Sequence, residues 1–302
     1  MLPQPEIPFL SALPTCTTSL ADHDAVVLEN RCVGSNFYVM QLATPNTLAF
    51  VPGQFVMIDL PQSGFFLRRP MSIMQVIDAP EPYRQAFSIF YKVHGKGTQA
   101  MSTWPIGQAT RVLGPLGKGF PLPVSGQSQL MVGGGIGVAP FVAVQAHARA
   151  QGIPLGQNRL VYGVRSSQDI GILPELEALF GSENLLVCTQ DGSQGIAGTV
   201  IDALTQRSEW LADAHAVLTC GPTPMMRALA GFLDKQAPAL PLWVSLEERM
   251  PCGTGACTGC VITLNTSPLP VKTCIEGPVF LANTIDWEAS APKTLAVGGG
   301  CK

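Results

Sequence analysis

Four cysteines near the end of the chain have the spacing of an iron–sulfur site. Cys252, Cys257 and Cys260 form a C-x4-C-x2-C run, and thirteen residues separate Cys260 from Cys274. Such a triplet with a more distant fourth cysteine is the plant-type ligand pattern for a 2Fe–2S cluster. Because this cluster transfers one electron at a time, the pattern predicts a protein that handles electrons.

A zinc site and unmetallated thiols are the alternatives to the cluster. Structural zinc sites usually pair two C-x2-C knuckles, and this run contains only one. Gly253, Gly255 and Gly259 favour a bulkier group, because glycines let the backbone wrap closely around it and direct N–H groups at its sulfurs. Disulfides are not expected, since the nine cysteines are odd in number and nothing resembles a signal peptide. Five further cysteines are expected to be mostly small buried apolar residues: Cys16, Cys32, Cys188, Cys220 and Cys301.

Length and composition indicate a globular protein of two domains and a small module. The chain has 302 residues, of which 46% are hydrophobic and 13% charged. The low charge is consistent with apolar surface covered by a partner, or with a large core. A net charge of −3 gives no reason to expect nucleic acid or an anionic membrane. No apolar stretch reaches transmembrane length, so we expect a cytoplasmic protein without a membrane span.

The elements that must position the cysteines fall into two patterns. Between about Ala25 and Pro123, short apolar or alternating segments end in turn residues, which predicts an antiparallel barrel or sandwich. From about Gln127, strands alternate with helices, which predicts a parallel sheet covered by helices. The predicted strands are 25–28, 37–42, 55–60, 87–93, 129–132, 159–163, 185–189, 216–219 and 242–246, and the predicted helices are 139–150, 174–180 and 225–234.

A glycine-rich turn joins the first strand and helix of the second pattern. Gly133-Gly-Gly-Ile-Gly137 would let a phosphate approach the backbone, and the helix that follows supplies N–H donors. The run is not a clean G-x-G-x-x-G, and the usual ribose-binding acid is not obvious. A simple tight turn is the alternative.

Two segments of the first pattern could also bind a phosphate. In Leu67-Arg-Arg-Pro-Met-Ser-Ile73, Arg69 can neutralise a phosphate and Ser72 can hydrogen-bond a ring edge or ribose, while Pro70 fixes the chain between them. Gly95-Lys-Gly-Thr98 is a second loop of small residues. Taken alone, the first segment could be only a solvated strand end, and the second could be only an ordinary turn.

Taken together, these segments resemble the ferredoxin–NADP reductase superfamily. More narrowly, they resemble the family of electron-transfer subunits of the two-protein, NAD-linked dihydroorotate dehydrogenases. The matching blocks occur in the family's order over roughly residues 25–280 and are 67–73, 91–98, 113–120, 132–140, 191–193, 219–225, 245–260 and 274–280. The short gap between Cys260 and Cys274 fits the subunit family better than reductases with a longer ferredoxin domain.

The resemblance implies a multi-domain chain of β and α/β class. It would contain an antiparallel β-barrel that binds FAD, a parallel-sheet α/β domain that binds nucleotide, and a small C-terminal 2Fe–2S module. The implied boundaries are an N-terminal extension 1–22, the FAD barrel 23–124, the NAD domain 125–241, the cluster module 242–285 and a C-terminal tail 286–302.

The resemblance also assigns site residues. The thiol of Cys220 would lie near the nicotinamide, although simple packing at a strand end is an equal alternative, and no catalytic residue is certain. Arg165 and Ser166 could favour a 2′-phosphate, but the family is NAD-linked and we expect NAD. The implied FAD residues are Arg69, Pro70, Met71, Ser72, Tyr91, Lys92, Val93, Gly97 and Thr98. The implied NAD(H) residues are Gly133, Gly134, Gly135, Gly137, Asp191, Gly192, Cys220, Gly221 and Pro222, and the implied cluster ligands are Cys252, Cys257, Cys260 and Cys274.

The implied function follows from counting electrons. NAD chemistry moves two electrons as a hydride and a 2Fe–2S cluster moves one, so FAD must stand between them. The resemblance implies a partner, an FMN-containing catalytic subunit that oxidises dihydroorotate in pyrimidine biosynthesis, in a heterotetramer of two plus two. The alternatives are a stand-alone NAD(P)H-dependent reductase feeding an oxygenase, a hydrogenase or a ferredoxin, and a non-enzymatic redox-sensing or binding module.

Overall fold

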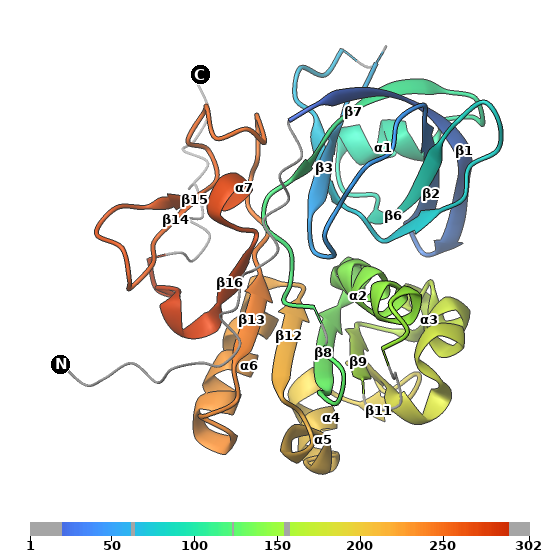
Figure 1. Cartoon of the computed structure of the whole chain (residues 1–302). Coiled ribbons are helices and arrows are strands. Elements are labelled where there is room, and N and C mark those ends of the chain that lie inside the picture. Colours follow the sequence, from blue (N-terminus) through green and yellow to red (C-terminus); the bar gives the residue numbers. More distant parts are fainter. Residues whose placement is uncertain (1–19, 62–63, 123, 154–157, 290–302) are drawn as a thin grey trace, which may run out of the picture.

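The computed structural model describes residues 20–61, 64–122, 124–153 and 158–289. A curved antiparallel sheet, a helix-covered parallel sheet and a small module with little regular structure lie against one another (Figure 1). Cys16 and Cys301, and most of the predicted N-terminal extension and C-terminal tail, lie outside the described residues. In the described part of the chain, no helix has the length and apolar character needed to cross a membrane.

The antiparallel sheet forms a barrel-like domain with strand order β4-β3-β7-β1-β2-β6-β5, and its curvature brings β4 close to β6. Its apolar side chains form one core, which includes Met101 of α1. Figure 1 shows α1 lying against the curved sheet. This confirms the predicted antiparallel architecture. The elements are β1 (Asp22–Gly34), β2 (Phe37–Thr44), β3 (Phe55–Ile58), β4 (Arg69–Ser72), β5 (Gln75–Ile77), β6 (Gln85–Lys92), α1 (Lys96–Ser102) and β7 (Ala109–Leu116).

The second sheet has the order β11-β10-β9-β8-β12-β13-β16 and is parallel except for β16. One face packs on α2 and α3 and the other on α4 and α6, each through its own apolar core. The strands are β8 (Gln129–Gly134), β9 (Arg159–Val164), β10 (Leu185–Thr189), β11 (Ile196–Ala197), β12 (Ala216–Cys220), β13 (Leu242–Ser245) and β16 (Val279–Leu281). The helices are α2 (Ala139–Ala150), α3 (Leu173–Phe180), α4 (Val200–Gln206), α5 (Glu209–Ala212) and α6 (Thr223–Gln236).

The chain order of this sheet reverses between β8 and β12. From β8 the chain moves outward to β9 and β10, then returns to β12 on the other side of β8. Open α/β sheets bind ligands outside the carboxyl ends of their strands at such a reversal. The glycine turn after β8 and the segment after β12 both lie at this point.

The cysteine-rich module is an excursion between two strands of the parallel sheet. It contains β14 (Val261–Ile262), β15 (Val271–Lys272) and α7 (Thr273–Glu276), and the chain then returns as β16 to pair with β13. The sequence-based boundaries placed residues 242–245 in the module, whereas the structure pairs them with β12. The boundaries themselves remain a prediction.

Polar contacts join the barrel to the domain that is built on the parallel sheet. Ser35 N donates to Gln168 O at 3.2 Å, and Lys92 Nζ lies 3.9 Å from Asp169 Oδ1. Phe37 and Phe90 of the barrel also share a core with α2. The segment that joins the two domains is tied to the module, because Lys118 N donates to Gly277 O at 2.6 Å.

Candidate functional site

The four cysteines predicted as cluster ligands lie in the module between β13 and β16. Cys260 and Cys274 are buried, with 2% and 1% of their surface exposed, whereas Cys257 is exposed. Backbone amides already point at two of the sulfurs: Thr254 N lies 3.4 Å from Cys252 Sγ, and Gly259 N lies 3.4 Å from Cys257 Sγ. Amide donors of this kind stabilise thiolates and cluster sulfurs.

The thiols interact in two pairs. Burial raises the pKa of Cys252, but hydrogen bonds from Cys257 and Thr254 outweigh it and lower that pKa to about 6. Burial, followed by the hydrogen bond with Cys260, raises the pKa of Cys274 to about 12. The stronger interactions therefore join Cys252 with Cys257 and Cys260 with Cys274, and a weaker one joins Cys252 with Cys274.

This paired arrangement fits a binuclear cluster. A 2Fe–2S cluster takes four cysteines, two for each iron. Among the residues described, no three His, Cys, Asp or Glu side chains are grouped so as to hold a single metal ion. Gly253 and Gly255 have φ of 72° and 78°, and a Cβ on either would lie within 3 Å of Met57 or Ile275 side-chain carbons. The loop thus needs glycines at these turns, and the residues present fit a 2Fe–2S cluster.

The module packs directly on the barrel. Phe55, Met57 and Leu116 of the barrel form one apolar group with Met250, Cys260 and Cys274, which we call the barrel–module junction. Within β3 and β4, Met57 pairs with Pro70 and Phe55 with Ser72. The cluster ligands therefore lie one strand away from the predicted flavin segment Arg69–Ser72.

Arg69 and Gly97 are brought together from separate parts of the barrel. A Cβ built on Gly97 would lie 2.7 Å from Arg69 Cζ, so the guanidinium covers this glycine. Arg69 Nη1 donates to Leu67 O at 2.6 Å, and the guanidinium carbon lies 5.4 Å from the Phe65 ring centroid. A fixed cation beside a small-residue loop suits a pyrophosphate, and this pairing supports FAD binding at the predicted residues.

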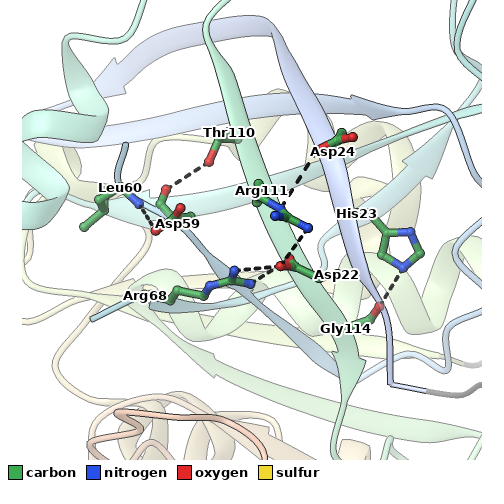
Figure 2. A network of polar contacts seen from close by, with 9 residues as sticks. All are labelled: Asp22, His23, Asp24, Asp59, Leu60, Arg68, Thr110, Arg111 and Gly114. Carbon is green, nitrogen blue, oxygen red and sulfur yellow. Dashed lines mark hydrogen bonds and ion pairs between the residues drawn. The ribbon is translucent and has the colours of Figure 1, made fainter. Parts of the chain in front are cut away.

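The preceding arginine is bound within the protein (Figure 2). Arg68 Nη1 and Nη2 donate to the two carboxylate oxygens of Asp22 at 2.8 and 2.9 Å, and Arg111 Nη2 lies 3.2 Å from Asp22 Oδ2. The hydrogen bond from Arg68 holds the pKa of Asp22 below its usual value, although burial opposes it. The same pair raises the pKa of Arg68. Arg68 thus ties the segment before β4 to β1, and Arg69 is the arginine available to a cofactor.

The side chains of the other predicted flavin residues are mostly engaged in the protein. Tyr91 is buried in the barrel core, donates its hydroxyl to Asn30 Oδ1 at 3.0 Å, and has a raised pKa because of burial. Thr98 Oγ1 accepts from His94 N at 2.7 Å and so shapes the loop before α1. Lys92 Nζ lies 4.6 Å from the centroid of the Phe37 ring. These side chains position the site, and Val93 is partly buried against the same core.

The glycine turns after β8 and β12 contact each other. A Cβ on Gly134 would lie 2.8 Å from Pro222 Cδ, and one on Gly137 would lie 2.7 Å from the α-carbon of Gly221. Gly135 has φ of 55°, and a Cβ there would meet nothing within 4 Å. The structure therefore brings most of the predicted NAD(H) residues together, with an open side at Gly135 before α2.

Cys220 has two neighbours that sequence reasoning missed. Burial, followed by the charge of Glu247, raises the pKa of its thiol to about 12, and a hydrogen bond with Ser245 opposes the shift. Ser245 pairs with Cys220 across β12 and β13. Ser245 and Glu247 both lie at the start of the block 245–260. The match of this block to the family was the signal that could have identified them.

Asp191 lies apart from the glycine turns, beyond the end of β10. Its Oδ1 accepts from Ser193 N at 3.0 Å and Oγ at 2.6 Å, which lowers the pKa of the exposed carboxyl group. Its own N–H donates to Arg165 O at 3.2 Å. Asp191 and Gly192 therefore lie at the same edge of the sheet as Arg165. They follow β10, which is two strands away from β8.

Comparison with known proteins gives two family matches. Residues 247–286 match the iron-sulfur cluster binding domain of dihydroorotate dehydrogenase B, and residues 131–230 match the oxidoreductase NAD-binding domain. A relative from Bacillus pumilus (strain SAFR-032) is 35% identical over 265 residues, covering 86% of this chain and 96% of the relative. A relative from Bacillus caldolyticus is 37% identical over 238 residues, covering 78% and 86%. Both are named dihydroorotate dehydrogenase B (NAD(+)), electron transfer subunit.

Solved structures share the fold. The structure of an NADH-dependent reduced ferredoxin-NADP oxidoreductase, described for flavin-based electron bifurcation, has a TM-score of 0.71 and 28% identity over 88% of this chain and 90% of that chain. The ferredoxin reductase in carbazole 1,9a-dioxygenase has a TM-score of 0.61 and 20% identity, covering 73% and 67%. The second likeness concerns the fold alone.

Proposed function

Since the chain belongs to the family of electron transfer subunits of dihydroorotate dehydrogenase B (NAD(+)), we propose that it relays electrons between NAD and a catalytic partner subunit. The chain is an oxidoreductase component with the fold of the ferredoxin–NADP reductases. The observation that carries the proposal is the barrel–module junction, because it sets Cys260 and Cys274 one strand from Arg69–Ser72.

FAD, a 2Fe–2S cluster and NAD(H) are the cofactors in this proposal. When bound, FAD exchanges a hydride with nicotinamide and single electrons with the cluster. Arg69 would neutralise the FAD pyrophosphate beside Gly97, and Pro70, Met71 and Ser72, partly buried on the edge strand β4, would line the flavin site. Tyr91, Lys92, Val93 and Thr98 hold the barrel wall and its loop in place. Cys252, Cys257, Cys260 and Cys274 hold the cluster.

The glycine turns after β8 and β12 form the NAD(H) site in this proposal. The dinucleotide phosphates bind at the open side of the turn, at Gly135 before α2. Gly133, Gly134, Gly137, Gly221 and Pro222 shape this turn by packing closely. Cys220 presents a neutral thiol at this edge, because its pKa lies far above physiological pH. Asp191 and Gly192 bind the adenosine end. We prefer NAD over NADP, since the relatives at 35% and 37% identity are named for NAD(+).

The partner is an FMN-containing catalytic subunit that oxidises dihydroorotate to orotate in pyrimidine biosynthesis, in a heterotetramer of two plus two. Its docking surface is the exposed face of the cysteine module. Residues 250–271 include no Asp, Glu, Lys or Arg, and Val261, Leu269 and Ile275 are 43%, 72% and 44% exposed. A hollow of about 220 Å³ next to Cys274 is lined by Leu20, Leu116 and Ile275, among others. A partly apolar face with few charges beside the cluster suits a stable partner that receives or donates electrons there.

A cytoplasmic location suits this assignment. The described cysteines form no disulfide, and reduced thiols of this kind are maintained in the cytoplasm.

Co-expression with an FMN-binding dihydroorotate dehydrogenase subunit tests the proposal. We expect a stable complex with FAD, FMN and two irons per copy of this chain, which reduces NAD when given dihydroorotate. A matched complex carrying Cys257→Ser should lose this activity while it keeps FAD. If the complex shows no NAD-linked turnover while this chain alone reduces a ferredoxin or an oxygenase, the chain is a stand-alone reductase and the proposal is wrong.

A further inference from the structure

Thr273 has a buried hydroxyl group that lacks a hydrogen-bond partner. The residue is 0% exposed and directly precedes the cluster ligand Cys274. Within the described residues, its Oγ1 makes no hydrogen bond. Buried hydroxyl groups in native proteins are nearly always paired, because an unpaired one loses its hydration without compensation. An exception beside a cofactor site therefore calls for a partner that the bound cofactor supplies.

Two backbone hydrogen bonds fix Thr273, one to the buried ligand Cys260 and one from Gly277, which follows α7. Thr273 N donates to Cys260 O at 2.9 Å, and Gly277 N donates to Thr273 O at 3.1 Å. These two backbone bonds hold Thr273 next to Cys260 and Cys274, the two buried ligands.

The start of α7 does not supply the hydroxyl group with the usual helical acceptor. A threonine inside a helix commonly donates to the carbonyl of residue i−3 or i−4. Thr273 is the first residue of α7, so no preceding helical turn provides that carbonyl. The neighbouring ligands belong to the barrel–module junction, whose other members are the apolar side chains Phe55, Met57, Leu116 and Met250.

We propose that Thr273 donates a hydrogen bond to a sulfur atom of the bound cluster or of its ligands and thereby raises the reduction potential of the cluster. The inference rests on the cluster assignment made under the proposed function. Reduction adds one negative charge to the cluster, and a donor aimed at its sulfurs stabilises that charge more than the oxidised form. Thr273 thus tunes how readily the cluster accepts an electron, without being a ligand.

The purified holoprotein allows a direct test with two substitutions at this position. Thr273→Val keeps the shape of the side chain and removes the hydroxyl group, whereas Thr273→Ser keeps the hydroxyl group. We expect all three proteins to hold two irons per chain. The midpoint potential, measured by redox titration followed by electron paramagnetic resonance, should fall in Thr273→Val and stay close to the wild-type value in Thr273→Ser. Thr273→Ala should shift the midpoint potential as Thr273→Val does. It replaces the valine variant if that variant binds less than two irons per chain.

A second measurement separates tuning from altered packing. Transfer from H₂O to D₂O should shift the Fe–S stretching bands in resonance Raman spectra of the wild type, and Thr273→Val should reduce that shift. Thr44→Val is the matched control, since the Thr44 hydroxyl group is equally buried but donates to Asn46 O at 2.6 Å in the barrel. It should change neither the potential nor the isotope shift.

The outcomes are distinguishable. Equal potentials and equal isotope shifts in the loaded wild type and Thr273→Val would overturn the inference while leaving the cluster in place. A wild-type protein that holds no iron would instead overturn the proposed function.

Discussion

The guanidinium group of Arg69 covers Gly97, at the point where any larger residue would place its first side-chain carbon. A Cβ there would lie 2.7 Å from Arg69 Cζ. One residue comes from an edge strand of the barrel and the other from the first turn of α1. Their contact joins two of the segments expected to bind the FAD pyrophosphate.

Replacing this glycine should displace the arginine. In Gly97→Ala, the added methyl group collides with the guanidinium group, so we expect FAD affinity to fall by about tenfold or more, a loss of roughly 1.4 kcal/mol in binding free energy. Fluorescence titration of the FAD-depleted protein with FAD measures it. Gly231→Ala is the control, because a Cβ on Gly231 meets nothing within 4 Å. If both variants bind FAD like the wild type, Arg69 does not contact the cofactor.

The two adjacent arginines should have separable effects. Arg69→Ala should release FAD on gel filtration but leave thermal stability of the FAD-depleted protein nearly unchanged. Arg68→Ala should lower the free energy of unfolding by about 1 kcal/mol, since it breaks a two-point pair with Asp22 that is still partly exposed to solvent. Urea unfolding and FAD retention are measured for both variants. If Arg68→Ala releases FAD and Arg69→Ala destabilises the fold, the two roles are assigned wrongly.

The pair between Arg68 and Asp22 also predicts a pH dependence. The pKa of Asp22 is lower in the folded protein than its usual value of 3.8, so its stabilising effect is present above pH 3.8 and is lost as the pH falls through the folded pKa. The difference in unfolding free energy between wild type and Asp22→Asn should be constant from pH 8 to pH 5 and shrink below about pH 4. Urea unfolding of both proteins across this range measures it. A difference that grows on acidification would have the wrong sign.

Loss of one cluster ligand should leave the flavin site intact. Cys257→Ser should remove the visible absorption of the cluster and bound iron, while FAD content stays at one per chain, because the FAD residues lie on the barrel. Cys32→Ser changes an exposed cysteine of β1 and should keep its iron. Two irons per chain in Cys257→Ser would show that the ligand set is wrong.

The docking surface can be tested with one charge. Ile275→Glu places a carboxylate on the partly apolar surface beside Cys274 and should reduce co-purification of the catalytic subunit by at least about tenfold, because a buried unpaired charge is costly. Ile106→Glu alters another exposed isoleucine, outside the module, and should have no effect. Equal recovery of the partner with both variants would place the interface elsewhere.

Local sequence patterns predicted many of the elements well. The helix 139–150 and the strand 185–189 match α2 and β10 end to end, because helix and strand periodicities are properties of neighbouring residues. The prediction missed β7, whose Gly114 and Pro115 interrupt the alternation, and it interpreted the segment of β4 only as the end of a strand. Pairing with β3 from elsewhere in the chain makes both segments strands.

The sequence by itself determined the four candidate cluster ligands, since three lie within one short loop and their spacing is a local property. It also determined the order of barrel, parallel sheet and module. Only the tertiary structure showed what Arg68 does, because the partner that binds it is Asp22, 46 residues earlier in the chain. Only the tertiary structure joined Cys260 and Cys274 to β3, and buried Thr273 with its hydroxyl group unpaired. Contacts between distant segments depend on how whole sheets pack, and no spacing along the chain encodes them.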